Sequence, residues 1–429
     1  MSNISKTLPY RLTQNGIYYG HVILVVGTLG VIMSIPGQTM GVSVYTDHLI
    51  ESLKLTRSEL SIMYLLGTLS SSFILPYAGK LLDRLGPRLM GTIACSSLGL
   101  FLLYISHSSQ LVKILTSLTN ISSKLTTMIV IYFGFLGIRH FGQGQLAMIS
   151  RTMIGMWYEK NRGLMLGVSG FFVAFGFGVA PLFLNFLIES YEWRHSLILL
   201  AVILFTMAFI AFCFFRKSPE EFGIEIDGKA SSSTANVSLE DSYNLAEARK
   251  TSIFWVFNMG LVAQAMLITG VTFHMSQIAR LNEMTSQKAF GIFLPIAIIA
   301  TIADLIGGYL SDRIKIKYVL SAMMLGLATG LFGIQNFSTN WGYILACIGL
   351  GTSSGLYAQL TGAAWPKLFG RGDLGEIAGL ATALMVLGSA LGPYTLSLGT
   401  NELSSFKEVV GFTILIPLIT FVSSFFVKK

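Results

Sequence analysis

Apolar residues in this 429-residue chain occur in blocks of about twenty, separated by short polar segments. A helix of about that length crosses the hydrocarbon core of a bilayer. The chain is 53% hydrophobic and 12% charged, whereas soluble domains carry about 25% charged residues. These features predict an all-α, multi-pass membrane protein.

Twelve blocks qualify as membrane spans. They cover residues 17–45, 57–82, 88–106, 126–150, 163–188, 195–215, 252–277, 286–310, 317–336, 341–365, 375–399 and 407–427. The first block is too long for the core of a signal peptide and lacks a small-residue cleavage site, so we expect it to be retained as a span. Thr56 and Glu59 have the spacing of a capping box and predict the start of the second span.

The longest polar segment, residues 216–250, divides the chain. Its Ser, Thr, Gly and acidic residues are typical of a mobile linker, and its end predicts a short interfacial helix. We therefore expect an N-terminal six-helix bundle over 1–215, a cytoplasmic linker over 216–250 and a C-terminal six-helix bundle over 251–429.

Lys and Arg between the spans predict the orientation, because these residues are retained on the cytoplasmic side. With the N-terminus in the cytoplasm, the cytoplasmic segments hold more than twice as many Lys and Arg as the opposite segments. The net charge of +8 thus indicates topology rather than nucleic-acid binding. We expect both termini in the cytoplasm and the protein in a bacterial inner (plasma) membrane.

Two sequence repeats relate the halves of the chain. GKLLDRLGPR (79–88), after the second span, recurs in part as GYLSDRIKIK (308–317), after the eighth. In spans five and eleven three residues recur at identical spacing: Gly167, Gly176 and Pro181, and then Gly379, Gly388 and Pro393. The halves therefore resemble duplicated six-helix units, a recurring plan in transporters with a central site.

The two charge clusters follow equivalent spans. A carboxylate at a helix C-terminus is unfavourable unless a cation or the N-terminus of a neighbouring helix receives it. We therefore expect Asp83 and Asp312 to dock on the opposite packing surface, as a latch that holds one conformation and opens in another. A topology anchor is the simpler alternative, but it does not explain the repeated Gly and Asp. The predicted latch residues are Gly79, Asp83, Arg84, Gly86, Arg88, Gly308, Asp312 and Arg313.

Ionisable residues within spans are few, and such residues are costly and usually functional. Arg139, about 20 Å from the outer end of the fourth span, needs a carboxylate from the protein or a substrate. Alternatively, it bonds backbone carbonyls of neighbouring helices. Asp304 in span eight favours its neutral form when buried. It could carry a proton, neutralise Arg139, bind a cationic substrate, or pair with a neighbouring helix.

Other polar residues extend this predicted substrate and proton pathway. Gln143 shares a helix face with Arg139, and PGQTMG (36–41), which contains Gln38, interrupts the first span. His274, near the outer end of span seven, is either an interface residue or a proton carrier, and each glutamine is alternatively a packing residue. The remaining predicted pathway residues are His140, Gln264 and Gln359.

Several motifs resemble those of one transporter family. GKLLDRLGPR closely resembles the signature between spans two and three of the major facilitator superfamily, RHFGQG (139–144) resembles its span-four motif, and the glycine-rich fifth span resembles its antiporter motif. Shorter stretches resemble the bacterial monocarboxylate and oxalate:formate antiporter branch: WYEKNRGLMLG, YEWRHS, SPEEFGIEIDG, AEARKTSIFW and WPKLFG. The superfamily resemblance covers nearly the whole chain and implies the twelve-helix major facilitator fold with alternating access.

The branch resemblance implies a secondary transporter of a small, monocarboxylate-like solute. Asp304 and Arg139 within the spans favour coupling to protons, by symport or antiport. Carriers of this branch hold the carboxylate with an arginine in span eight, and many use a lysine in span one. This chain has no arginine in span eight before Arg313, and Asp304 lies close to the implied position. Either Arg139 supplies the cation, or the substrate is not an anion. Proton-driven efflux of drugs or amphiphilic metabolites is therefore the alternative.

Other functional classes fit less well. The spans contain no paired aspartates, Ser/His pair or His-Glu-x-x-His helix for an intramembrane enzyme, and the chain has no Walker A motif. A channel does not explain the duplicated halves, and a sensor would carry an added soluble domain. Cys95, Cys213 and Cys347 lie within apolar blocks without metal-ligand spacing. We expect no enzyme activity, cofactor, metal or nucleic-acid partner; the expected partners are a small-molecule substrate, the lipid bilayer and protons, with the protein a monomer.

Overall fold

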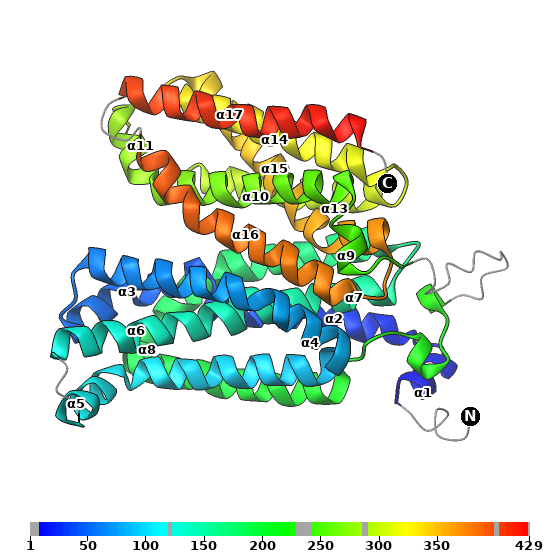
Figure 1. Cartoon of the computed structure of the whole chain (residues 1–429), viewed down its shortest axis with the longest axis horizontal. Helices are drawn as coiled ribbons and strands as arrows, with labels where there is room; N and C mark the ends of the chain where they lie inside the picture. Colours follow the sequence, from blue (N-terminus) through cyan, green and yellow to red (C-terminus); the bar gives the residue numbers. More distant parts are fainter. Residues whose placement is uncertain (1–7, 119–121, 229–241, 285–290, 399–402, 428–429) are drawn as a thin grey trace. The chain divides into compact units, whose positions relative to one another are not determined.

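Every regular element in the described residues is helical (Figure 1). The structure is a computed structural model that describes residues 8–118, 122–228, 242–284, 291–398 and 403–427. Ten helical segments are long and apolar enough to cross a membrane. The prediction of an all-α, multi-pass membrane protein is confirmed.

These ten segments cover eleven of the twelve predicted spans. The long helix α4 (Arg57–Ser106) contains spans two and three, because its backbone leaves the helical conformation at Gly86. Likewise α8 (Arg162–Phe214) contains spans five and six and kinks at Glu192. The remaining predicted span, the tenth, is α15 (Asn340–Phe369), a 30-residue helix rich in Gly, Ser and Thr that is not among the ten apolar segments.

The α-helices of spans one and four are interrupted part-way along their length. Span one consists of α2 (Tyr19–Met33), the short 3-10 helix η2 (Ile35–Gly37) and α3 (Thr39–Leu53), which confirms the break predicted at Pro36 and Gly37. Span four passes from α6 (Ser123–Ile138) through a π-helix, η3 (Arg139–Leu146), into α7 (Ala147–Trp157). π-Helices are rare and frequently occur at functional sites.

By their contacts, the residues form two compact units. The first contains Met1–Met153, Phe175–Gly228 and Ala378–Ala383, and the second contains Ile154–Ala174, Lys229–Ile377 and Leu384–Lys429. These units follow packing, whereas the predicted domain boundaries follow the sequence repeat. Those boundaries stay a prediction.

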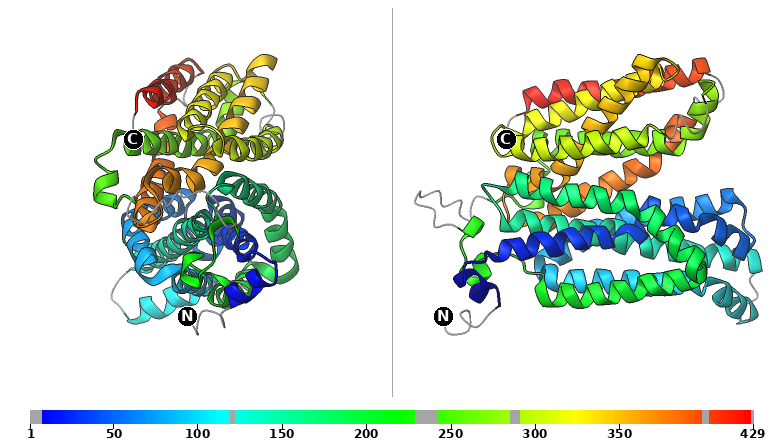
Figure 2. Two further views of the ribbon diagram at one scale, coloured as in Figure 1. Left: turned by 90° about the vertical axis from the view of Figure 1, so that its right-hand side faces the viewer. Right: turned by 180° about the vertical axis from the view of Figure 1, so that it is seen from behind.

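Within each unit, the helices pack lengthwise. In the first unit α4 packs against α6 and η3, and α5 (Ser108–Leu118) packs against α6. In the second unit α14 (Ile316–Gln335) contacts both α15 and α17 (Leu403–Phe426), and α13 (Phe293–Ser311) packs on α15 (Figure 2). The remaining helices are α1 (Leu8–Gln14), η4 (Glu220–Phe222), η5 (Ile226–Gly228), α9 (Leu245–Ala248), α10 (Ser252–Phe273), α11 (Met275–Leu281) and α16 (Leu374–Ser397).

Helix starts agree with the capping residues in the sequence. The predicted box at Thr56 and Glu59 is present, with Glu59 N–H donating to Thr56 Oγ1 and Thr56 N–H donating to Glu59 Oε2. A second box, Asn244 and Glu247, begins α9, the short helix expected at the end of the linker. Residues 229–241 of the linker lie outside the described residues.

The repeated glycines occupy equivalent places in the two sequence halves. A Cβ at Gly167 in span five would lie 3.2 Å from the Asp304 carbonyl oxygen in span eight, and one at Gly379 in span eleven would lie 2.9 Å from Gly79 Cα in span two. These glycines therefore bring spans five and eleven close to the spans that precede the two charge clusters.

The second pair of repeated glycines, Gly176 and Gly388, also lies at close contacts between helices. A Cβ at Gly176 would meet Ile32 in span one, and a Cβ at Gly388 would meet Val262 in span seven. Spans one and seven are equivalent in the proposed duplication, so these contacts support it. The side chains of Pro181 and Pro393 lie outside the described part of the structure.

We expect Gly86→Ala to destabilise the protein by about 1–3 kcal/mol. Gly86 has φ 76° and ψ 164°, a conformation that is essentially restricted to glycine. Thermal unfolding of the purified protein in detergent measures the change. Gly178→Ala is the matched control, because Gly178 is helical and a Cβ there would meet no atom of the surrounding described structure within 4 Å, which leaves open space for the methyl group. Equal stability of the two variants would contradict the strain argument.

Candidate functional site

The first part of the candidate site is a buried arginine at the start of the π-helix. Arg139 is only 2% exposed, and its Nε donates to Thr68 Oγ1 at 3.1 Å. Its Nη1 donates to the Gly37 carbonyl at 2.9 Å and to Thr39 Oγ1 at 3.4 Å. The guanidinium carbon also lies 4.9 Å from the centre of the Tyr64 ring. Spans one, two and four together hold this side chain.

The bonds of Arg139 leave part of the guanidinium unused. A guanidinium has five N–H donors, and the three bonds described involve only Nε and Nη1. The two N–H groups on Nη2 donate to none of the residues that the structure describes. Every polar partner is neutral, so within the described residues the charge of Arg139 has no carboxylate beside it.

The break in the first span creates the Arg139 environment. Pro36 interrupts the helix, which exposes the Gly37 carbonyl to the guanidinium. A Cβ at Gly142 would lie 2.8 Å from Gly37 Cα, so spans one and four approach closely at these two glycines. A larger residue at either position would separate the carbonyl from Arg139.

Three other predicted pathway residues lie in the same region of the first unit. Gln38 donates through Nε2 to Ser34 Oγ at 3.1 Å. His140 and Gln143 are on the π-helix, where His140 Nδ1 and Gln143 Oε1 are buried without a hydrogen-bond partner among the described residues. Span four thus presents unused polar atoms beside Arg139.

The second part of the candidate site centres on Asp304 in α13. Asp304 is 4% exposed and packs where α13 meets two glycine-containing helices. A Cβ at Gly170 of α8 would overlap Asp304 Oδ2, and a Cβ at Gly355 of α15 would lie 2.8 Å from its backbone nitrogen. Only glycines allow this carboxylate to fit between its neighbours.

The other predicted residues of the second unit differ in their surroundings. Gln359 donates to the hydroxyl of Ser311, the residue directly before Asp312, at 3.1 Å. Gln264 donates to Ser354 Oγ at 3.3 Å. His274 is the C-cap of α10 and packs edge-on against Phe273, and its role stays a prediction. Arg139 belongs to the first unit and Asp304 to the second.

Asp312 lies at the N-terminus of α8. Its carboxylate accepts hydrogen bonds from Gly163 N at 2.9 Å and Leu164 N at 3.0 Å. Lys367 Nζ lies 2.9 Å from Asp312 Oδ1 and also donates to the Ser311 carbonyl. Unpaired amides at a helix N-terminus favour a negative charge, and the ammonium of Lys367 adds to that preference.

The remaining latch residues have separate neighbours. A Cβ at Gly163 would overlap the Gly308 carbonyl oxygen, so α8 and α13 touch there. The Arg313 guanidinium lies 4.1 Å from the centre of the Tyr309 ring. In the first cluster, the Asp83 backbone carbonyl accepts from Lys217 Nζ at 2.9 Å, whereas Arg84, Gly86 and Arg88 line a cavity described below.

Sequence reasoning missed three contributors to the site. Thr68 and Tyr64 gave no signal, because a Thr or Tyr in a span is common and their positions beside Arg139 depend on how spans two and four pack. Lys367 stands 55 residues from Asp312 in the sequence. Among the described residues, no group of three or more His, Cys, Asp or Glu is placed to hold a metal ion.

Comparison with known families identifies the chain. The family model described as Major Facilitator Superfamily matches residues 27–393. The chain belongs to the major facilitator superfamily. It is therefore a multi-pass secondary transporter with the major facilitator fold, and not an enzyme. A comparison with curated proteins finds no significant match.

Solved structures of the superfamily share the fold at low sequence identity. The proton:xylose symporter XylE is 15% identical, with a TM-score of 0.68, over 94% of this chain and 95% of that one. The E. coli fucose:proton symporter FucP is 14% identical, with a TM-score of 0.63, over 96% and 99%. The human organic anion transporter MFSD10 (TETRAN) is 14% identical, with a TM-score of 0.62, over 94% and 99%.

Proposed function

We propose that this major facilitator protein transports a small organic anion, a monocarboxylate in the simplest case, together with protons by alternating access. The observation that carries the proposal is the state of Arg139, which is buried, bonded only to neutral groups and left with two N–H donors on Nη2. The carboxylate of a substrate supplies what this guanidinium lacks.

The energetics support an anionic partner for Arg139. An isolated charge costs several kcal/mol to bury, and neutral hydrogen bonds recover only part of that cost. Arginine presents parallel donors that match the two oxygens of a carboxylate. With Nε and Nη1 fixed by spans one and two, Nη2 is oriented before the substrate arrives, which lowers the entropy cost of binding.

Proton coupling is assigned to Asp304. Its carboxylate is buried against Gly170, so transfer of a proton changes the charge at a tightly packed helix contact. Proton coupling occurs in other proteins of this fold, since both XylE and FucP are proton symporters. Cytoplasmic termini and an inner-membrane location follow from the distribution of Lys and Arg.

The second candidate function is proton-driven efflux of drugs or amphiphilic metabolites. Span eight has no arginine before Arg313 and carries Asp304 instead, which would suit a cationic substrate. The branch resemblance favours a monocarboxylate, whereas this substitution favours efflux. The burial and unused donors of Arg139 favour an anionic substrate.

A panel of solutes tests the substrate class. The purified protein would be heated with mono- and dicarboxylates, amino acids, amines and cationic dyes, because a ligand that binds only the folded state raises the Tm. We expect stabilisation by one group of carboxylates, and no effect of those acids on Arg139→Ala. Stabilisation by amines or dyes alone would replace this proposal with efflux.

We further propose that the Asp312 contact is one of two latches that stabilise a conformation of the transport cycle. The carboxylate joins the N-terminus of α8, from the first half of the sequence, to α13 and to Lys367 on α15, from the second half. Hydrogen bonds to a charged group contribute about 1.5–3 kcal/mol each, enough to change the populations of two conformations.

We expect Asp312→Asn to increase the fraction of molecules in which the contact between residue 312 and the N-terminus of α8 is open. The amide keeps the shape of the side chain but loses the negative charge that Gly163 N, Leu164 N and Lys367 stabilise. A cysteine at the buried position Ser311 reports the opening, and its labelling by a maleimide should rise at least about tenfold for a loss of 1.4 kcal/mol. Lys315→Gln, in the same loop, is the control. Unchanged labelling in Asp312→Asn would exclude the latch.

A further inference from the structure

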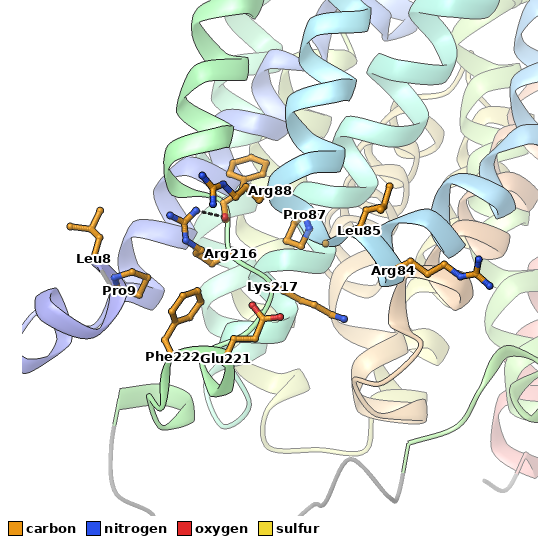
Figure 3. Close-up of a pocket in the computed structure, with 12 residues that line it drawn as sticks. Leu8, Pro9, Arg84, Leu85, Pro87, Arg88, Arg216, Lys217, Glu221 and Phe222 are labelled. Atoms are coloured by element: carbon orange, nitrogen blue, oxygen red, sulfur yellow. Dashed lines mark hydrogen bonds between the residues drawn. The ribbon is translucent and has the colours of Figure 1, made fainter. Parts of the chain in front are cut away.

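A basic pocket lies in the first unit, outside the Arg139 site. Its volume is about 430 Å³, within the range of small-ligand sites, and α1, the Gly86 turn of α4 and the segment after α8 form its walls (Figure 3). Four cationic side chains and one carboxylate line the basic pocket: Arg84, Arg88, Arg216, Lys217 and Glu221.

Two guanidinium groups form the centre of the basic pocket. Arg88 donates through Nε to the Phe212 carbonyl at 2.7 Å and lies 4.1 Å from the centre of the Phe212 ring. Arg216 donates through Nη1 to the Phe215 carbonyl at 2.7 Å. In Figure 3 the Arg88 and Arg216 side chains lie near each other, whereas Arg84 points away from them.

The Arg88 guanidinium retains donors for a ligand. Its only hydrogen bond with a described residue uses Nε, which leaves the four N–H groups on Nη1 and Nη2 for another partner. The turn at Gly86 has no atom within 4 Å of the position of a Cβ, so the wall of the pocket is open beside these donors. The contacts with Phe212 hold the arginine in place without neutralising it.

Cationic side chains outnumber carboxylates in the lining of the basic pocket. Burial lowers the pKa of Arg216, and the positive charge of Arg88 lowers it further, although Tyr19 raises it. Burial also raises the pKa of the Glu221 carboxyl, against the opposing effect of Lys217. With four cations and one carboxylate in its lining, the basic pocket carries an excess of positive charge that attracts anions.

We infer that the basic pocket binds a phosphate-bearing anion between the Arg88 and Arg216 guanidinium groups. Arginine pairs bind phosphate oxygens through parallel, charge-assisted hydrogen bonds. Leu8, Leu85 and Phe222 provide an apolar rim beside the charges, and Leu85 is 46% exposed. The phosphate comes either from the headgroup of an anionic phospholipid, whose acyl chains would cover that rim, or from a soluble phosphate compound.

Lipid retention is the first arm of the test. The protein would be reconstituted in phosphatidylcholine with one fifth phosphatidylglycerol, extracted in mild detergent and analysed by native mass spectrometry. The wild type should retain phosphatidylglycerol selectively. Arg88→Gln and Arg216→Gln should each reduce retention about fivefold, because one cation near a lipid phosphate contributes about 1 kcal/mol.

Inorganic phosphate is the second arm. Lipid-free protein in detergent would be titrated with phosphate while its Tm is followed, with chloride at matched ionic strength as the reference. Phosphate stabilisation without phosphatidylglycerol retention assigns the basic pocket to a soluble anion, and selective lipid retention assigns it to a headgroup. Neither effect in the wild type would overturn the inference.

Matched variants separate binding from folding. Arg216→Lys keeps the charge and should retain most of the lipid or phosphate response, whereas Arg216→Gln should show the reduced response. Lys113→Gln, an exposed lysine of α5, should leave the response unchanged. An equal response in Arg216→Gln, Arg216→Lys and the wild type would also overturn the inference. Each variant is compared only as a monodisperse, folded protein.

Discussion

Arg139→Ala is expected to weaken binding of the transported carboxylate at least about thirtyfold, since removing one partner of a buried, hydrogen-bonded charge pair costs 2–5 kcal/mol. The variant removes the donors on Nη2 that the substrate would use. It also leaves the Gly37 carbonyl without its guanidinium donor, so some loss of stability accompanies the loss of binding. Substrate titration followed by Tm or by intrinsic fluorescence measures the affinity.

Two further variants separate charge, geometry and folding in this experiment. Arg139→Lys keeps the charge but not the planar donors, so it should recover only part of the affinity. Arg194→Lys is the matched control, because Arg194 also bonds hydroxyls, those of Ser52 and Ser109, and stacks on an aromatic ring. Arg194 already has a carboxylate partner in Glu192. Equal affinity in Arg139→Ala and the wild type would exclude Arg139 as the anchor.

Asp304→Asn is expected to abolish uphill, proton-driven uptake while leaving substrate exchange largely intact. Asparagine preserves the fit against Gly170 and Gly355 but cannot exchange a proton. Accumulation against a gradient should fall by about tenfold or more, since the group that carries the proton is removed, whereas exchange between labelled and unlabelled substrate should persist.

A polar neighbour on the same helix provides the control for Asp304. Thr301 is half-buried on α13, and its hydroxyl donates to the Ala297 carbonyl, so Thr301→Val should change neither uptake nor exchange. If Asp304→Asn leaves uptake and its dependence on pH as in the wild type, proton coupling through this residue is wrong. Loss of both activities would instead assign Asp304 to substrate binding or to packing.

Local features of the sequence predicted much of the fold. The apolar blocks identified the spans, Pro36 and Gly37 marked the break in the first span, and Thr56 with Glu59 predicted the start of the second. Each of these signals acts over a few residues, through backbone conformation or capping. The repeated glycines also carried information, because a close helix approach requires a small residue at a particular turn.

The site depends on packing that a single sequence does not reveal. RHFGQG has no pattern that distinguishes a π-helix from an α-helix, yet the π-helix places Arg139 at the broken span. The hydroxyls of Thr39 and Thr68 resemble many others in the chain until spans one, two and four meet. The basic pocket likewise combines α1, the Gly86 turn and the segment after α8, which are far apart in the sequence.

The most direct test of the central claim is the internal pH of proteoliposomes when a carboxylate that stabilises the protein is added outside. The account predicts rapid acidification of the lumen with the wild type, because a proton enters with each anion. Protein-free liposomes and liposomes with Arg139→Ala should show only the slow change caused by diffusion of the neutral acid. Identical rates in all three preparations, or a response to amines and dyes alone, would contradict proton-coupled carboxylate transport through Arg139.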